Sequence, residues 1–434
     1  MNKIKSILKG YVDFPLVLKI LIGLIIGSLL GIFVPGISFI SLLGSLFTGA
    51  LKAIAPLLVF VLIISSLSSA GKGIGARFGR VIMLYMLSTF LAAAFAVVLS
   101  FIFPVTVSLG DMHISSAPEN IGEVLTNLLT KLVENPISAL MGGNYLAILT
   151  WSIALGFAIR SFASDKTKEL LSDLSTAVSK VVAGIIQLAP FGILGLVYSS
   201  VGEYGLAIFV DYGQLLLLLV SCMLIVFLVI DPLLVFLCLK RNPYPLVWRC
   251  IKESGISAFF TRSSAVNIPI NMQLCKRLGL EKEYYSVAIP LGATINMDGA
   301  AITITILSLS AAFTCGIDVN IVVAIILSFI ATLGACGASG VAGGSLLLIP
   351  MACSLLGVSS DVAMQMVAVG FIIGVVQDSL ETAINSSGDV IFAATAEYME
   401  WKKEGRDFKL GAYYEFDENS VGESIEAPDE TQSV

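Results

Sequence analysis

Long apolar runs constrain this chain more than any other feature of its sequence. Three of them, Ile20–Val34, Val81–Phe103 and Leu215–Leu239, approach or exceed the roughly 20 apolar residues that a helix needs to cross a bilayer. Apolar residues make up 57% of the chain and charged residues only 13%, with a mean hydropathy of +0.94. A water-soluble domain would expose too much apolar surface. Since backbone polar groups in lipid must be paired internally, we expect an all-α polytopic membrane protein.

Charged residues between the apolar runs predict how the chain crosses the membrane. Lys and Arg concentrate on the cytoplasmic side of membrane proteins. Basic residues precede the first run, separate the second from the third, and follow the fourth and the sixth. The links after the third and fifth runs are acidic instead. These basic residues are Lys3, Lys5, Lys9, Lys72, Arg77, Arg80, Arg160, Lys166, Lys168, Lys240, Arg241, Arg249 and Lys252. The pattern predicts six spans before residue 241 and a cytoplasmic N-terminus.

The alternation of charge breaks in the segment 255–275. This moderately apolar segment is interrupted by Thr-Arg-Ser-Ser at 261–264 and by Pro269, and both of its ends are basic. The simplest explanation is a re-entrant hairpin that enters from the cytoplasm and turns back at the Ser/Arg motif.

A second break lies in the apolar stretch 319–356. Asp318 and Asp361 flank it, and its middle is glycine-rich from residue 334 to residue 345. Glycine costs about 1 kcal/mol relative to alanine inside a helix, so a continuous helix is disfavoured here. We expect a second hairpin, entering from outside. Basic residues after position 401 predict a cytoplasmic C-terminus.

Eight transmembrane helices and two opposed re-entrant hairpins satisfy all of these charges. Hairpin–helix pairs of opposite orientation form inverted repeats, the architecture in which transporters place their substrate near the membrane midplane. We expect four regions. These are a cytoplasmic N-terminus (1–14), a six-helix region with the scaffold and part of the transport domain (15–240), a core of two hairpins and helices 7 and 8 (241–400), and an acidic cytoplasmic tail (401–434).

A polar stripe lies within the last apolar helix. Asp378, Thr382, Asn385 and Asp389 follow each other at spacings of three or four residues, so they share one helical face. A carboxylate in hydrocarbon costs roughly 3 kcal/mol or more, so this stripe needs a partner or an aqueous cavity. The stripe therefore indicates a site for an ion or a polar solute at membrane depth.

A second polar motif spans Gly292–Gly299. Asn296 and Asp298 are two residues apart and cannot share a helical face, but an unwound turn would let them converge on one cation. Ser88 and Thr89 could add hydroxyl oxygens. Arg262 is the only basic residue within either hairpin. Its natural partners are Asp378 and Glu381, so it could also be a structural counter-ion.

Together these motifs resemble the dicarboxylate/amino acid:cation symporters, the glutamate-transporter family. The similarity rests on Thr-Arg-Ser-Ser at 261–264, Asn-Met-Asp-Gly at 296–299, the glycine-rich stretch 334–345 and the polar stripe, in this order. It covers about residues 10–400 and is greatest to the bacterial sodium/serine–threonine symporters.

The resemblance implies a role for each matching position. Asp378 would hold the amino group of the substrate, Asn385 with the backbone of Ser264 and Gly340 its carboxylate, and Thr382 would also contact it. The other substrate-binding positions would be Arg262, Ser263, Val341 and Glu381.

The coupling ion implied by the resemblance is Na⁺, and no other cofactor is expected. One sodium would use Asp389 with carbonyls of Gly292, Asn296 and Asn385. A second would use backbone near Thr294, Ala335 and Ala338. A third would use Asn296, Asp298, Ser88, Thr89 and the Tyr85 carbonyl. The resemblance also implies a homotrimer in the bacterial inner membrane, in which a transport domain slides against a fixed scaffold and the second hairpin is the gate.

Two departures from the acidic-substrate members bear on specificity. Those members carry Arg at the position of Glu381 and Thr at the position of Ala300. Both changes remove groups that would hold a second carboxylate, and Glu381 would repel one. We therefore expect import of a small neutral amino acid, L-serine or L-threonine. Glu381 could instead be paired with Arg262 and have no effect on the substrate.

Other functions stay open at this point. The nearest is a Na⁺- or H⁺-coupled carrier of dicarboxylates or acidic amino acids. A channel and an intramembrane aspartyl protease using Asp298 and Asp389 are further alternatives. The lone His113 and seven scattered cysteines do not favour a serine protease, a metal site or a disulfide framework. No basic patch is dense enough for nucleic acid, so the expected partners are substrate, Na⁺ and the bilayer.

Overall fold

The computed structural model describes residues 14–69, 76–109, 130, 132–338, 343–415 and 425–426. This part of the chain is helical, apart from a short antiparallel pairing of β1 (Tyr414–Glu415) with β2 (Ile425–Glu426). The helices of the first half are α2 (Leu16–Phe33), α3 (Ser38–Ser69), α4 (Ala76–Ile102), α6 (Pro136–Gly142), α7 (Tyr145–Phe162), α8 (Asp165–Gln187), α9 (Ala189–Tyr204), η1 (Gly205–Ala207), α10 (Ile208–Ile225), η2 (Val226–Ile230) and α11 (Asp231–Leu239).

The second half is more broken. Its helices are α12 (Tyr244–Cys250), η3 (Ile251–Gly255), α13 (Ile256–Thr261), α14 (Ser264–Arg277), α15 (Lys282–Ile295), α16 (Asp298–Thr314), α17 (Ile321–Ala335), η4 (Gly344–Leu348), α18 (Ile349–Leu355) and α19 (Ser360–Lys403). All seven cysteines are free thiols.

Six helical stretches of the described residues are long and apolar enough to cross a bilayer. They are Ser38–Ser65, Arg77–Ile102, Tyr145–Phe162, Ala189–Leu239, Lys282–Thr314 and Ser360–Lys403, and shorter apolar helices lie at Leu18–Phe33, Ile321–Ala335 and Gly344–Leu355. The prediction of a helical, multi-pass membrane protein is confirmed in this form.

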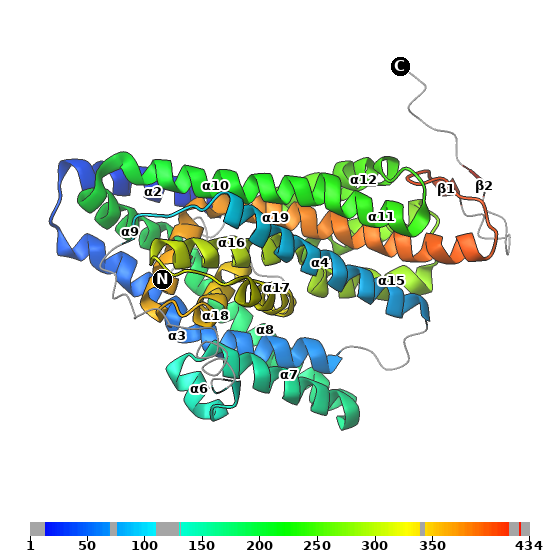
Figure 1. The fold of residues 1–434 in the computed structure, drawn as a ribbon, viewed down its shortest axis with the longest axis horizontal. Helices are drawn as coiled ribbons and strands as arrows, with labels where there is room; N and C mark the ends of the chain where they lie inside the picture. The colour runs from blue at the N-terminus through cyan, green and yellow to red at the C-terminus, as the bar shows by residue number, and fades with distance from the viewer. Residues whose placement is uncertain are drawn as a thin grey trace, which may run out of the picture.

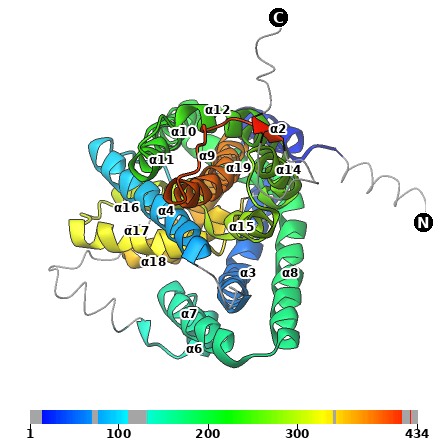
Figure 2. The ribbon, with the colours of Figure 1, turned by 90° about the vertical axis from the view of Figure 1, so that its right-hand side faces the viewer.

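Helix α19 is the centre of the larger group of helices. It packs against α4, α10, α11 and α13–α16, and against α18. Figure 1 shows it running along the length of the molecule beside α10 and α4, and Figure 2 shows it end-on with these helices around it. This packing explains how a helix with so many polar residues can lie in a membrane protein, because Asp378, Glu381, Asn385 and Asp389 all lie buried among other helices.

A second group consists of α2, α3, α7, α8 and α9. Glycines allow the closest approach within it. A Cβ added at Gly23 or Gly27 of α2 would lie only 2.3 or 2.5 Å from the Pro190 or Leu194 carbonyl oxygen of α9. Small residues four apart allow such contacts between membrane helices. Far fewer contacts join this group to the helices around α19.

Three interruptions in the second half create the site. Between α13 and α14 the chain turns at Arg262, which has a left-handed φ of 51°. Between α15 and α16, Asn296 and Met297 are not helical, as the glycines of the 292–299 motif predict. The third interruption lies between α17 and η4, where residues 339–342 are outside the described part. Half of the predicted acidic tail, residues 416–424 and 427–434, also lies outside it.

Candidate substrate and cation site

A polar pocket opens where the tips of the broken helices meet α19. It is lined by Arg262, Ser263, Ser264, Met297, Ala338, Asp378, Glu381, Thr382 and Asn385. Seven of these nine residues are ones that the sequence predicts for the substrate. Gly340 and Val341, which were also predicted, lie outside the described residues. The pocket therefore brings together the Ser/Arg motif and the polar stripe.

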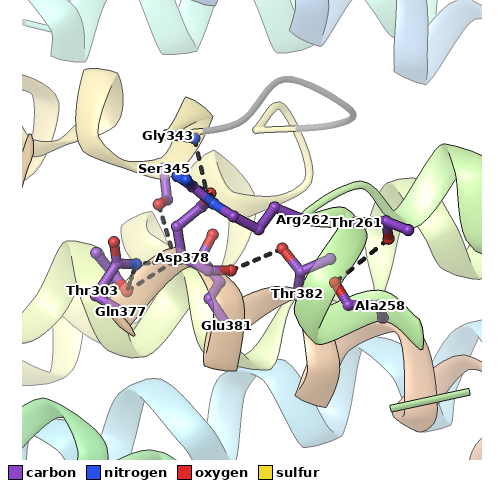
Figure 3. Close-up of polar contacts among 10 residues, drawn as sticks. All are labelled: Ala258, Thr261, Arg262, Thr303, Gly343, Ser345, Gln377, Asp378, Glu381 and Thr382. Atoms are coloured by element: carbon purple, nitrogen blue, oxygen red, sulfur yellow. Dashed lines mark hydrogen bonds and ion pairs between the residues drawn. The ribbon is translucent and has the colours of Figure 1, made fainter. Parts of the chain in front are cut away.

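Asp378 contacts the turn at Arg262 and the backbone at Gly343, which precedes η4 (Figure 3). Its Oδ2 accepts from Nε of Arg262 at 2.6 Å and forms an ion pair with the second guanidinium nitrogen at 2.6 Å. Its Oδ1 accepts from the backbone N–H of Gly343 at 3.1 Å. An ion pair this buried depends on good geometry, since both charges lose their hydration. Of the two partners predicted for Arg262, the structure has Asp378, and no ion pair with Glu381 exists among the described residues.

Glu381 is held by neutral donors instead. Its Oε2 accepts from the hydroxyls of Thr303 at 2.8 Å and Ser345 at 2.9 Å, and from the Gln377 amide at 2.5 Å. Figure 3 shows these side chains gathered beside Asp378. The alternative that Glu381 is neutralised by Arg262 is therefore wrong for this structure. Ala300 is buried and is not among the residues that line the pocket.

Asn385 and Thr382 also line the pocket. The Asn385 side-chain oxygen accepts from the Gly299 N–H at 2.8 Å, while its amide nitrogen lies 3.4 Å from the Met297 sulfur. Since a thioether is a weak acceptor, that amide could donate to a better one. The Thr382 hydroxyl donates to the Asp378 carbonyl of its own helix at 2.8 Å.

The start of α14 also faces this pocket. Ser263 is its N-cap, and its hydroxyl accepts from the Val266 N–H at 3.4 Å. The first N–H groups of a helix have no partner within the helix and favour anions. Ser264 lies at the first position of α14 and lines the pocket.

A second cluster of oxygens surrounds the break between α15 and α16. Oδ1 of Asp298 accepts from Thr89 at 2.7 Å and from Ser88 at 3.1 Å. The Asn296 amide donates to Oδ1 of Asp389 at 3.2 Å and to the Asn385 carbonyl at 3.1 Å. The structure thus brings together side chains that the resemblance assigns to two different sodium ions.

One oxygen of each of these two carboxylates lacks a hydrogen-bond partner within the part of the chain that the structure describes. Oδ2 of Asp298 and Oδ2 of Asp389 are buried and unpaired among the described residues. The Tyr85 hydroxyl donates to the Asp389 carbonyl at 2.9 Å. A Cβ at Gly292 would lie 2.8 Å from Oδ1 of Asp389, so this glycine also belongs to the cluster. Buried carboxylate oxygens without hydrogens to accept are suited to a hard cation.

The positions predicted for the second sodium are only partly brought together. The Thr294 hydroxyl donates to the Pro290 carbonyl in its own helix at 3.1 Å. The adjoining Ile295 carbonyl lies 3.7 Å from the sulfur of Cys336, next to Ala335. Ala338 lines the substrate pocket. No group of three or more His, Cys, Asp or Glu that could hold a metal ion exists among the described residues.

Sequence reasoning missed several residues at this site. Met297 lines the pocket, and the backbone of Gly343 and the side chains of Thr303, Ser345 and Gln377 hold the two acids. Gln377 lies four residues before Glu381, which is a signal that could have paired them.

A second missed set fixes the first hairpin to α19. The Asn267 amide donates to the hydroxyls of Ser386 and Ser254 at 2.7 and 3.0 Å. The Asn271 amide donates to the Ser386 carbonyl at 2.9 Å. All four residues are buried. The polar residues of α14 are spaced for this role, but their partner lies more than a hundred positions away in sequence.

A polar pocket between broken helices of a membrane protein is typical of membrane transporters. The comparisons with known proteins agree. The profile of the sodium:dicarboxylate symporter family matches residues 16–399, and the chain belongs to this family. The family consists of transporters, so the chain is not an enzyme.

Curated relatives resemble the chain along nearly its whole length. It is 53% identical over 427 residues to a serine/threonine transporter SstT of Bifidobacterium adolescentis, covering 97% of this chain and 99% of the relative. It is 55% identical over 395 residues to the protein of that name from Streptococcus agalactiae, covering 91% and 98%. For the one from Enterococcus faecalis the identity is 55% over 391 residues, covering 90% and 93%.

Proposed function

We propose that this protein is a secondary active transporter that imports L-serine and L-threonine together with Na⁺. The observation that carries the proposal is the surroundings of Glu381. This acid lines the pocket, and its hydrogen bonds come from neutral side chains. A second carboxylate on the substrate would meet a fixed acid there. The names of the relatives, which are serine/threonine transporters, agree with this chemistry.

The proposed binding mode uses the zwitterion of the substrate. The amino group binds Asp378 and competes for it with Arg262, which occupies its Oδ2 in this structure. The substrate carboxylate lies at the start of α14 near Ser264 and receives the amide of Asn385. The side-chain hydroxyl then points toward Thr382 and Glu381. Gly340 and Val341 complete the pocket from the second hairpin.

Two of the proposed sodium sites lie in the cluster of oxygens around the break between α15 and α16. Asp389 with the carbonyls of Gly292, Asn296 and Asn385 holds one ion. Asp298 with Ser88, Thr89, Asn296 and the Tyr85 carbonyl holds another. A further ion uses backbone near Thr294, Ala335 and Ala338. Oδ2 of Asp298 and Oδ2 of Asp389, which have no hydrogen-bond partner among the described residues, support cation binding at the first two.

For the architecture we propose eight spans and two opposed hairpins. In this arrangement α2 is the first span, and the stretch Ala189–Leu239 is two spans that divide at Gly205, which has a left-handed φ of 69°. The helices around α19 form the transport domain of residues 241–400 with α4, α10 and α11. The group of α2, α3 and α7–α9 is the scaffold, and the sparse contacts between the two groups support sliding of one against the other.

We further propose that the protein is a homotrimer in the bacterial inner membrane, with both termini in the cytoplasm. Basic residues near both ends support this orientation.

The test is uptake of radiolabelled L-serine into proteoliposomes that contain the purified protein. Each tenfold concentration ratio of Na⁺ provides about 1.4 kcal/mol for accumulation. An inward Na⁺ gradient should concentrate serine above its external level, whereas an equal K⁺ gradient should not. Equal uptake under both gradients would contradict the proposed coupling. The second candidate is a carrier of dicarboxylates or acidic amino acids. Accumulation of succinate or aspartate, or accumulation driven by a proton gradient, would favour it.

A further inference from the structure

Ser345 is a buried serine of η4 that donates a hydrogen bond to an acid of the pocket (Figure 3). Its hydroxyl lies 2.9 Å from Oε2 of Glu381, and only 1% of its surface is exposed. Ser345 is not among the residues that line the pocket, whereas Glu381 is. An effect of Ser345 on the substrate therefore has to act through this acid.

The donors that meet at Oε2 of Glu381 differ in how firmly they hold it. The Thr303 hydroxyl lies 2.8 Å from this oxygen but also 3.0 Å from the Gly299 carbonyl oxygen. Since a hydroxyl has one hydrogen, Thr303 can donate fully to only one of them. The Gln377 amide donates to Glu381 and to the Thr303 oxygen. The Ser345 hydroxyl has Glu381 as its only hydrogen-bond partner among the described residues, so its hydrogen is committed to this acid.

The other oxygen of the Glu381 carboxylate is free to bind a donor. In the described part of the chain the hydrogen bonds of Glu381 end on Oε2, and none ends on Oε1. With Oε2 held by three donors, Oε1 is the acceptor that this acid offers to the pocket. A hydroxyl can donate to it, whereas a second carboxylate on the substrate has no hydrogen to give.

A fixed acceptor of this kind distinguishes a hydroxyl from a methyl group. Sites that hydrogen-bond a substrate hydroxyl reject the analogue that lacks it, because the buried polar group is then left unpaired. The discrimination requires that the acceptor keeps its orientation. A Glu side chain has several rotatable bonds, so donors such as Ser345 are needed to fix its carboxylate.

We propose that Ser345 is a positioning residue for substrate selection. Its hydroxyl holds Oε2 of Glu381, so that Oε1 accepts the side-chain hydroxyl of serine or threonine, and the protein prefers these two amino acids to alanine. The inference rests on the proposed function and deepens it, since it gives the substrate hydroxyl an acceptor and names a residue that fixes this acceptor.

The experiment measures uptake of radiolabelled L-serine into proteoliposomes at one inward Na⁺ gradient, with unlabelled L-alanine as competitor. Because a hydrogen bond to a charged group is lost with alanine, the inhibition constant of alanine should exceed the KM for serine at least about tenfold in the unmodified protein. In Ser345→Ala the KM for serine should rise about fivefold or more, while the alanine constant changes less than about twofold, since alanine has no hydroxyl to misplace.

Ser328→Ala is the matched control. Ser328 is a buried serine of α17, on the other side of the same interruption, and its hydroxyl donates only to the Ala324 carbonyl of its own helix in the described structure, at 3.2 Å. This variant should leave both constants as they are in the unmodified protein.

A purely structural role of Ser345 would weaken serine and alanine equally, and that result would overturn the inference. Unchanged constants in Ser345→Ala, or equal affinities of the unmodified protein for serine and alanine, would also overturn it. If Ser345→Ala does not fold, Ser345→Cys provides the readout. A thiol is a weak donor, so the ratio of the alanine constant to the serine KM should fall about threefold or more, and an unchanged ratio would overturn the inference. If the unmodified protein shows no Na⁺-driven serine uptake, the proposed function itself fails.

Discussion

Arg262 forms the turn of the first hairpin and pairs with an acid of the proposed substrate site. Its backbone has a left-handed φ of 51°, which is uncommon for a residue other than glycine, Asn or Asp. Such conformations cost on the order of 1–3 kcal/mol and persist where surrounding contacts enforce them. The buried pair with Asp378 is such a contact. Arg262 therefore links the turn of the first hairpin to the acid proposed to bind the amino group.

We expect substrate selection to depend on Glu381. In Glu381→Gln the charge is lost, while the amide oxygen can still accept from Thr303 and Ser345. Removing a like charge should strengthen inhibition of serine uptake by aspartate about tenfold or more, which corresponds to about 1.4 kcal/mol. Serine uptake itself should persist. The measurement is the aspartate concentration that halves serine uptake in proteoliposomes.

If Glu381→Gln leaves the aspartate concentration that halves serine uptake unchanged, Glu381 has no role in substrate selection. The matched control is Thr395→Val on the same helix. The Thr395 hydroxyl donates only to the Ile391 carbonyl of its own helix in the described structure, so its loss should leave selectivity as it is.

Asp389 is a buried acid at a proposed sodium site, and its Oδ2 has no hydrogen-bond partner among the described residues. Asp389→Asn keeps an oxygen that can accept from the Asn296 amide but removes the charge. Hydrogen bonds and contacts to charged groups contribute about 1.5–3 kcal/mol, so the Na⁺ concentration for half-maximal uptake should rise at least tenfold. Sodium dependence measured at saturating serine checks this. A half-maximal Na⁺ concentration equal to that of the unmodified protein would exclude Asp389 from the site.

At the scale of elements, the site depends on how closely the break after α15 approaches α19. A Cβ added at Gly388 would lie 2.6 Å from the amide nitrogen of Asn296. Gly388→Ala should therefore displace Asn296 from Asp389 and lower sodium affinity by several-fold. Gly374→Ala is the matched control, because no atom lies within 4 Å of a Cβ at this position of the same helix. Equal sodium affinities for the two variants would contradict the claim that sodium binding depends on the close contact between Gly388 and Asn296.

Some elements could be predicted because their cause is local. The break at Asn296 follows from glycines on both sides and from two polar residues that cannot share a helical face. The clustering of Asp378, Thr382 and Asn385 follows from helical periodicity alone.

Other features depend on contacts between distant segments and could not be predicted. The sequence left open which acid pairs with Arg262, because Asp378 and Glu381 lie within one turn of each other on the same helix. The donors to Glu381 come from α16 and η4, and no spacing in sequence relates them.

For the whole molecule, we expect helix α19 to make binding of substrate and sodium interdependent. Asp378 and Asp389 lie on one helix, and Asn385 between them contacts the break that carries Asn296. Sodium binding should therefore strengthen serine binding, and serine should strengthen sodium binding by the same factor. Serine affinity at low and high Na⁺, and Na⁺ affinity with and without serine, check this. A gain in one direction only would contradict coupled equilibrium binding at these sites.

The central claim is that the pocket accepts a neutral zwitterion and excludes a second carboxylate. The most direct measurement is competition against radiolabelled L-serine uptake at one fixed inward Na⁺ gradient, with unlabelled threonine, aspartate and succinate. We predict that threonine blocks uptake, while equal concentrations of aspartate and succinate leave it nearly unchanged. Inhibition by aspartate or succinate as strong as that by threonine would contradict the role assigned to Glu381.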